Sequence, residues 1–125
     1  EPTNGIVAAP EASQAAYASF AGAGRDRLCI AEQGGKASFV TYAEGTDANC
    51  LVRGSWSPGG PQAIKPDGDP SCSIIFNKDQ QEIRLVAGGP GCAYYCGPGA
   101  SFAGKTFTRM AKPEPVSDIV GDPLC

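Results

Sequence analysis

The stretch Cys72-Ser-Ile-Ile-Phe76, the polar segment Asn77–Gln81 and the stretch Glu82-Ile-Arg-Leu-Val-Ala-Gly88 together decide the fold of this chain. On both sides of the polar segment, apolar residues occupy every second position, which is the period of a strand with one buried face. A short polar segment between two such runs is typical of a β-hairpin. The buried stripes of this predicted hairpin are Cys72, Ile74 and Phe76 on the first strand and Ile83, Leu85 and Ala87 on the second.

The same two-residue period recurs along the chain, in residues 27–31, 38–42, 50–56 and 105–110. Seventeen glycines and eleven prolines among 125 residues favour many turns and short strands over long helices. Strands therefore alternate with turns rather than with helices. The sequence predicts a mainly β fold, a small antiparallel barrel or sandwich with disulfides and at most one short N-terminal helix.

The N-terminal residues differ from the rest in composition. Residues 1–22 are rich in alanine, and Pro10 is placed to open a short helix over residues 11–20, with Tyr17 and Phe20 on one face. We interpret residues 1–22 as an arm or short helix and residues 23–125 as a single disulfide-stabilised β domain.

Six cysteines and no histidine mark the chain. An even set of cysteines without a CxxC pair or a histidine is typical of a disulfide framework rather than of a zinc site. The spacing leaves the pairing open, although a bond from Cys125 would hold a tail that prolines break repeatedly. The predicted disulfide cysteines are Cys29, Cys50, Cys72, Cys92, Cys96 and Cys125.

A disulfide framework predicts an exported protein that is periplasmic, lipid-anchored or extracellular. A chain that begins at Glu1 fits either processing after export or trimming. No apolar run is long enough for a transmembrane helix. The net charge is -3 with the basic residues scattered singly, so nucleic acid is not an expected partner.

The sequence gives little support for a catalytic or a cofactor-binding site. Without histidine, Ser-His, Cys-His and His-metal catalysis are excluded. Residues Gly99–Thr106 match the GxxxxGK[ST] phosphate loop, but that loop needs a following helix, and the sequence after it is β-prone and broken by Pro113 and Pro115. The pair Asp67 and Asp69 is interpreted as a turn rather than a calcium loop. No cofactor is predicted.

Large aromatic residues beside glycine- and proline-rich loops are candidate binding groups. We expect Trp56 to cap the core, because its position follows the parity of Val52. The adjacent Tyr94 and Tyr95 would point to opposite faces of a strand, so one of them is expected to be exposed.

The segment Cys96-Gly-Pro-Gly-Ala-Ser-Phe102, followed by Phe107-Thr-Arg-Met110, resembles the motifs of bacterial periplasmic and membrane-bound inhibitors of C-type lysozyme. The resemblance implies a small disulfide-bonded antiparallel barrel that inserts a serine and a lysine into a lysozyme cleft. In this chain the serine position falls on Cys96 and the lysine position on Arg109. A cation on a rigid loop can engage the cleft carboxylates, a part that either Arg109 or Lys105 could play.

These observations predict an exported, non-enzymatic binding or envelope domain whose partner is a protein or a glycan. One alternative is a lysozyme inhibitor, and another is a glycan-acting enzyme that uses a pair of carboxylates. The candidate binding residues are Tyr94, Tyr95, Ser101, Lys105 and Arg109.

Overall fold

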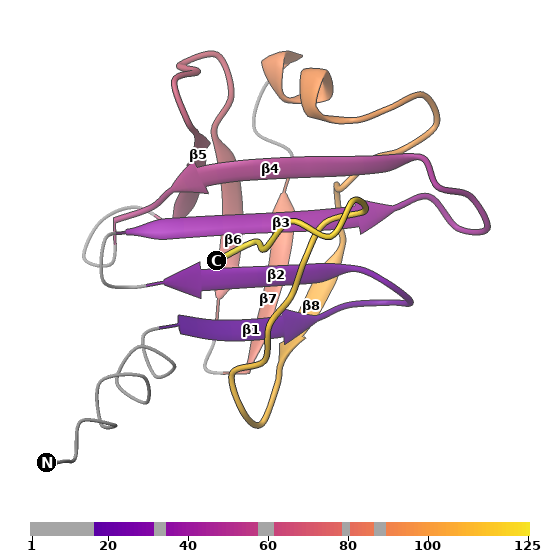
Figure 1. Ribbon diagram of the computed structural model, residues 1–125. Coiled ribbons are helices and arrows are strands. Elements are labelled where there is room, and N and C mark those ends of the chain that lie inside the picture. The colour runs from indigo at the N-terminus through magenta and orange to yellow at the C-terminus, as the bar shows by residue number, and fades with distance from the viewer. Residues whose placement is uncertain (1–16, 32–34, 58–61, 79–80, 87–89) are drawn as a thin grey trace, which may run out of the picture.

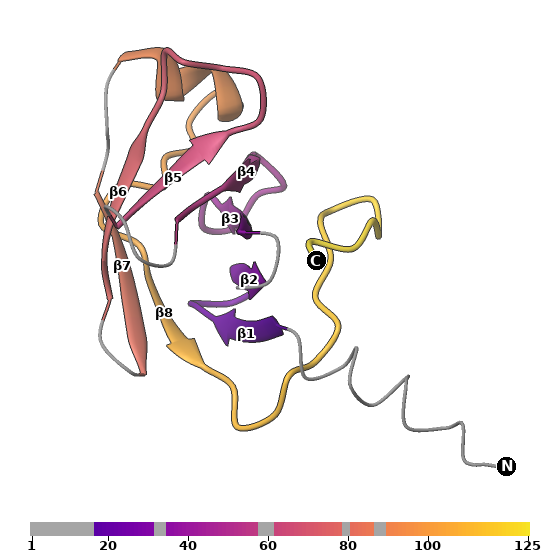
Figure 2. The ribbon, with the colours of Figure 1, turned by 90° about the vertical axis from the view of Figure 1, so that its left-hand side faces the viewer.

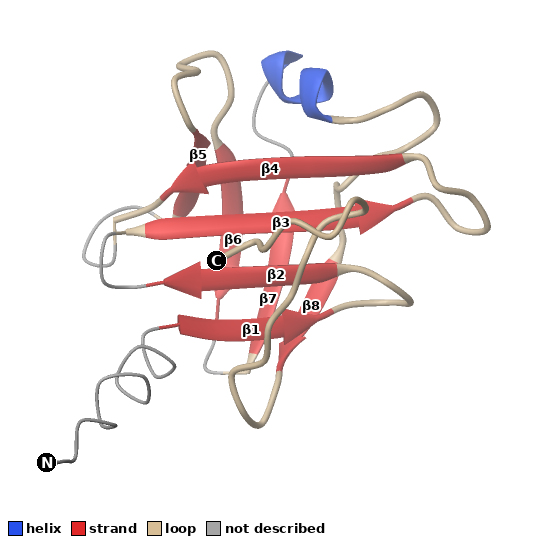
Figure 3. Ribbon diagram, viewed as in Figure 1, coloured by secondary structure: helices blue, strands red, loops and turns tan. Residues whose placement is uncertain are grey.

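The computed structural model describes residues 17–31, 35–57, 62–78, 81–86 and 90–125. These residues form eight β-strands and one 3-10 helix, η1 (Figure 3). The mainly β class predicted from the alternating pattern is confirmed. In chain order the elements are β1 (Tyr17–Ala21), β2 (Arg27–Ala31), β3 (Lys36–Tyr42), β4 (Asn49–Ser55), β5 (Ala63–Pro66), β6 (Ile74–Lys78), β7 (Glu82–Val86), η1 (Pro90–Tyr95) and β8 (Thr106–Arg109).

The strands form a closed barrel (Figure 1). Each strand pairs antiparallel with the next in the chain, and β8 pairs with β1 through Phe20 opposite Arg109 and Ala21 opposite Thr108. Figure 2 shows β1 to β4 on one side of the molecule and β6 to β8 on the other. Closure leaves neither β1 nor β8 as an unpaired edge that could recruit another strand.

Strand β1 corrects the prediction for the N-terminal residues. Residues 11–16 of the predicted helix lie outside the described part of the chain, but Tyr17–Ala21 is a strand, so the helix prediction is wrong there. The β domain consequently includes β1 and does not begin at residue 23. The physical reason is tertiary: β1 pairs with both β2 and β8, and Phe20 is fully buried, which outweighs the weak helix preference of a short alanine-rich segment.

The barrel interior contains the stripes that identified the central hairpin. Strands β6 and β7 pair with Phe76 opposite Leu85, and Ile74, Phe76, Ile83 and Leu85 are buried as predicted, whereas Ala87 lies outside the described residues. Trp56 is buried against Phe76 with ring centroids 5.9 Å apart, so the prediction that it caps the core is also confirmed.

All six cysteines form disulfides, which confirms the predicted framework. Such a framework is typical of proteins that fold in an oxidising compartment. No helix in the described ranges is long and apolar enough to cross a membrane. The pairs are Cys29–Cys125, Cys50–Cys96 and Cys72–Cys92.

Residues 110–125, which we call the C-terminal strap, cross the outer face of the β1–β4 side (Figure 2). Val116 and Leu124 of the strap form a second hydrophobic cluster with Cys29 and Val40 on the outside of the barrel. The Glu114 N–H donates to the Ser19 hydroxyl at 2.8 Å. The Cys29–Cys125 bond secures the strap at its far end, as expected for a tail rich in proline.

Candidate functional site

Three connections meet at the end of the barrel where β1 and β3 finish and β8 starts. They are the β1–β2 turn, the β3–β4 turn and the loop of residues 97–105. A cavity of about 400 Å³, which we call the barrel mouth, opens between them. Its lining residues are Ala23, Gly24, Arg25, Asp26, Tyr42, Ala43, Glu44, Gly45 and Lys105.

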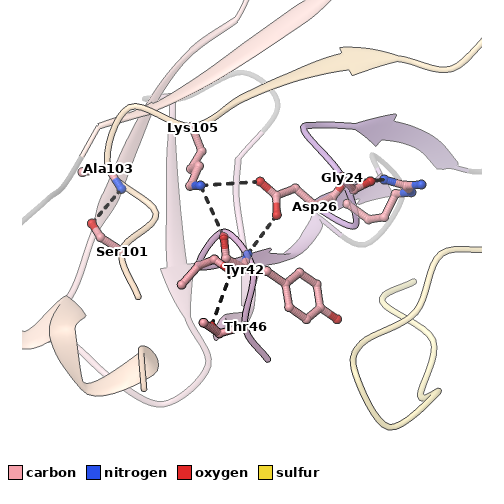
Figure 4. Close-up of polar contacts among 9 residues, drawn as sticks. Gly24, Asp26, Tyr42, Thr46, Ser101, Ala103 and Lys105 are labelled. Atoms are coloured by element: carbon pink, nitrogen blue, oxygen red, sulfur yellow. Dashed lines mark hydrogen bonds and ion pairs between the residues drawn. The ribbon is translucent and has the colours of Figure 1, made fainter. Parts of the chain in front are cut away.

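Asp26 is the buried acid of the barrel mouth, with a side chain only 3% exposed. Its Oδ1 accepts the Tyr42 N–H at 2.9 Å, and its Oδ2 lies 3.9 Å from the Lys105 Nζ (Figure 4). The turn that holds Asp26 is packed against the start of β8, because a Cβ on Gly22 would lie 2.8 Å from the Thr106 carbonyl oxygen. Only glycine at position 22 therefore permits this arrangement.

Lys105 supplies the cation of the barrel mouth. Its Nζ donates to the Tyr42 carbonyl oxygen over a long 3.4 Å, and its side chain is 32% exposed. An ammonium group has three donors, and the separation of 3.9 Å from Asp26 is an ion pair without a close hydrogen bond. Lys105 therefore retains donor capacity for an acceptor that enters the cavity.

Arg25 and Tyr42 form one wall of the barrel mouth. The guanidinium carbon lies 3.9 Å from the centre of the Tyr42 ring, a cation-π contact. Arg25 also donates to the Thr46 carbonyl oxygen at 2.8 Å and pairs with Asp47 at 3.1 Å. Both Arg25 and Tyr42 also line a second cavity of about 450 Å³ beside the C-terminal strap, so the stacked pair borders both cavities.

Of the residues predicted from the sequence, Ser101 and Lys105 lie on the same loop that leads into β8, but their side chains point to different neighbours (Figure 4). Lys105 lines the barrel mouth, whereas Ser101 lines a separate cavity of about 320 Å³ beside η1. Ser101 is exposed, and its Oγ accepts the Ala103 N–H at 3.2 Å. Arg109 is exposed on β8, four residues beyond Lys105, which is about 13 Å along an extended chain. The structure therefore separates the two cations that the lysozyme-inhibitor resemblance left as alternatives.

The adjacent tyrosines lie in η1, away from the residues that line the barrel mouth. Tyr94 is 85% exposed, and Tyr95 is half-buried, with its hydroxyl donating to Asp69. The prediction that one of the two rings is exposed is confirmed, although the backbone is a 3-10 helix rather than a strand.

The sequence did not identify Arg25, Asp26 and Tyr42 as site residues. Asp26 stands between two arginines, a pattern typical of a solvated turn. Its burial depends on Tyr42 and Lys105, which are distant in the chain, so no local signal marks it.

Two further motifs behave as predicted. Thr106 of the GxxxxGK[ST] match begins strand β8, so the helix that a phosphate loop requires does not follow it. Asp67 and Asp69 flank Gly68, which has a φ of 71° typical of a tight turn. Within the described residues, no group of three or more histidine, cysteine, aspartate or glutamate side chains could hold a metal ion.

A comparison with known protein families, with curated proteins and with solved structures gives no match for this chain. The chemistry of the barrel mouth is then the basis for a functional assignment: a partly exposed ammonium, set beside a buried carboxylate, that can donate to an acidic ligand group.

Proposed function

We propose that this protein is an exported binding domain without catalytic activity, and that it binds a carboxylate group of its partner at the barrel mouth. The observation that carries the proposal is the Lys105 ammonium, which lines the cavity and whose contacts at 3.4 Å and 3.9 Å leave donor capacity for an acceptor of the partner. The three disulfides support a periplasmic, lipid-anchored or extracellular location.

The loop that presents Lys105 is anchored at its start and at Phe102 before any ligand arrives. Cys96 at its base is bonded to Cys50 of β4. Phe102 is buried and packs edge-to-face on Phe39, with ring centroids 5.4 Å apart. A loop that is already ordered loses little conformational entropy on binding, which favours recognition by a fixed cation.

A carboxylate-type enzyme acting on glycans is the weaker alternative. It is supported by Asp26 and Glu44, which line the same cavity. However, the two Asp26 oxygens already face the Tyr42 N–H and the Lys105 ammonium, an arrangement that suits a structural acid better than a proton donor. Release of reducing sugar from peptidoglycan or chitin by the wild type, lost in Glu44→Gln, would overturn the non-enzymatic proposal.

The direct test compares glutarate with glutaramide, its uncharged analogue, by NMR titration of the Lys105 side-chain signals. We expect glutarate to bind at least about tenfold more tightly, since a hydrogen bond to a charged group contributes about 1.5–3 kcal/mol. Lys105→Met should abolish the difference, and Lys112→Met, at an exposed position of the C-terminal strap, should preserve it. Equal binding of the two compounds would refute a carboxylate site.

A C-type lysozyme is the particular partner that the resemblance suggests, and it is supported by an exposed serine, Ser101, on the loop that also carries Lys105. Cys96 is bonded to Cys50 and offers no hydroxyl, so Ser101 replaces it in this proposal. We expect inhibition of cell-wall lysis by a C-type lysozyme, weakened at least about tenfold by Lys105→Met and little changed by Arg109→Met. Full lysozyme activity with excess protein would exclude this partner.

A further inference from the structure

A second cluster of polar and aromatic side chains lies where the β5–β6 connection meets η1. The Cys72–Cys92 bond joins the two segments. Their backbones approach so closely that a Cβ on Gly91 would lie 2.6 Å from the Ser71 carbonyl oxygen. We call Asp69, Ser71, Tyr94 and Tyr95 the η1 corner; none of them lines the barrel mouth.

The two tyrosine rings of the η1 corner stand at a right angle. Their planes meet at 86° with the ring centroids 5.3 Å apart. The Tyr95 ring is fixed because its hydroxyl donates to Asp69, and the Tyr94 ring packs on it while remaining 85% exposed. An aromatic ring is thus held in a defined orientation with most of its surface open to solvent.

Asp69 is the charged group of the corner. One carboxylate oxygen accepts both the N–H and the hydroxyl of Ser71, at 2.8 Å and 2.6 Å, and the other accepts the Tyr95 hydroxyl. The hydrogen bonds from Ser71 and Tyr95 lower the pKa of Asp69. The hydrogen bond between the Tyr95 hydroxyl and Asp69 also raises the pKa of Tyr95 to about 12. At neutral pH the carboxylate is therefore ionised.

No lysine or arginine in the described part of the chain forms an ion pair with Asp69. Its partners are hydroxyl and amide donors, which leave the negative charge uncompensated. The faces of the two tyrosine rings are also regions of negative potential because of the ring quadrupole. The carboxylate and the ring faces consequently both favour a positively charged ligand.

We propose that the η1 corner binds an organic cation, an ammonium or guanidinium group. The cation lies against the exposed Tyr94 face, with Tyr95 as the perpendicular wall and Asp69 as the counter-charge at its hydroxyl end. Perpendicular aromatic walls beside an acid are a general means of recognising such cations. A neutral sugar would stack on Tyr94 and could donate a hydroxyl to Asp69, but it would not neutralise the charge of the carboxylate as a cation does. The assignment is independent of the barrel mouth.

The test uses two cations, each with an uncharged analogue of the same shape, and follows the Tyr94 and Tyr95 ring signals by NMR. Choline is compared with 3,3-dimethylbutan-1-ol, and N-acetyl-arginine amide with N-acetyl-citrulline amide. We expect each cation to bind at least about tenfold more tightly than its analogue. Preference for choline would indicate a small quaternary ammonium ligand, and preference for the arginine compound a basic side chain of a protein partner.

Matched variants separate the contribution of the Tyr94 ring from that of the Asp69 charge. Tyr94→Phe should retain binding, Tyr94→Leu should remove it, and Asp69→Asn should weaken it at least about tenfold, whereas Asp67→Asn in the same turn should change it little. Asparagine can still accept the Ser71 N–H, so the turn is preserved, as circular dichroism and intact disulfides would verify. Equal binding of cations and neutral analogues would overturn the proposal. Ring shifts with cellotetraose but not with the cations would also overturn it, in favour of a glycan surface.

Discussion

Cys125, the last residue of the chain, is bonded to Cys29 in the middle of β2, with a sequence separation of 96 residues. This bond holds the C-terminal strap against the outside of a barrel that is already closed. Leu124, next to the bond, is buried with Val40 in a cluster separate from the barrel interior. The protein thus has two hydrophobic cores, of which the outer one depends on the strap.

We predict that removing the Cys29–Cys125 disulfide destabilises the protein more than removing Cys72–Cys92, the disulfide that closes the shortest loop. The chain-entropy model assigns about 4.7 kcal/mol to a loop of about 100 residues and about 3 kcal/mol to a loop of about 15 residues. The double variant of Cys29→Ala and Cys125→Ala should therefore lose more free energy of unfolding than that of Cys72→Ala and Cys92→Ala, whose loop spans 20 residues. Urea unfolding monitored by Trp56 fluorescence measures both, and the reverse order would contradict a structural role for the strap.

A second prediction concerns the ion pair of the barrel mouth. Asp26→Asn keeps an acceptor for the Tyr42 N–H but removes the counter-charge of Lys105, and we expect a loss of about 1–3 kcal/mol in the free energy of unfolding. In a double-mutant cycle with Lys105→Met, the coupling should be about 0.5–1 kcal/mol, because Lys105 is partly exposed to solvent. No measurable coupling would show that Asp26 does not position the cation.

The period of the sequence carried most of the information on the fold, and β6 and β7 show why. Apolar residues at every second position of two adjacent segments define both the strands and their inner face, and this depends only on near neighbours in the chain. Strand β1 shows where the period fails. Tyr17 and Phe20 are compatible with a helix face, and only pairing with β2 and β8 makes the segment extended.

The candidate site was less accessible to sequence reasoning. Lys105 and Ser101 could be proposed because they lie within or next to the segments that resemble the lysozyme-inhibitor motifs. The burial of Asp26 and the bond between Tyr95 and Asp69 depend on contacts between distant segments, and the composition of those segments does not encode them. The exposure and the hydrogen-bond partners of these residues are therefore properties of the folded chain and not of any one segment.

The loop of the barrel mouth gives a third prediction. Phe102→Ala should cost about 3–5 kcal/mol, the usual loss for a buried phenylalanine, and should weaken every interaction that requires Lys105, since the loop loses its contact with Phe39. Phe102→Leu refills most of the volume and should cost less. Ser101→Ala, at an exposed position, should change the free energy of unfolding by no more than about 0.5 kcal/mol. Unchanged ligand binding in folded Phe102→Ala would show that loop order is unimportant.

The acid side of the stability profile is expected to depend on Asp118 of the C-terminal strap. Burial of this carboxyl works to raise its pKa, but the N–H groups of Asp122 and Val120 and the guanidinium of Arg53 outweigh burial and hold the pKa below its ordinary 3.8. A depressed pKa contributes stability above the unfolded value, and this is lost as the pH falls through the folded value.

Asp118→Asn should therefore be less stable than the wild type at pH 7, and the difference should shrink as the pH falls below 3.8. Urea midpoints at several pH values measure it. Asp47→Asn is the matched control, because Asp47 pairs with Arg25 at an exposed position and should follow the wild type closely. A gap for Asp118→Asn that does not change with pH would show that the ionised form of the Asp118 carboxyl is not the cause.

The alkaline side is expected to depend on the η1 corner, with the opposite sign. The Tyr95 pKa rises from 10.0 to about 12 because its hydroxyl donates to Asp69, so the folded state favours the protonated phenol. The stability that this bond contributes is complete below pH 10 and is lost as the pH rises towards about 12.

Tyr95→Phe should be less stable than the wild type at pH 8, and this difference in the free energy of unfolding should disappear between pH 10 and about 12. Tyr94→Phe is the matched control, because in the described structure its hydroxyl donates no hydrogen bond, and its profile should parallel the wild type. If Tyr95→Phe instead stays less stable by the same amount up to the end of the range, its loss reflects packing, and the hydroxyl bond to Asp69 does not fix the ring.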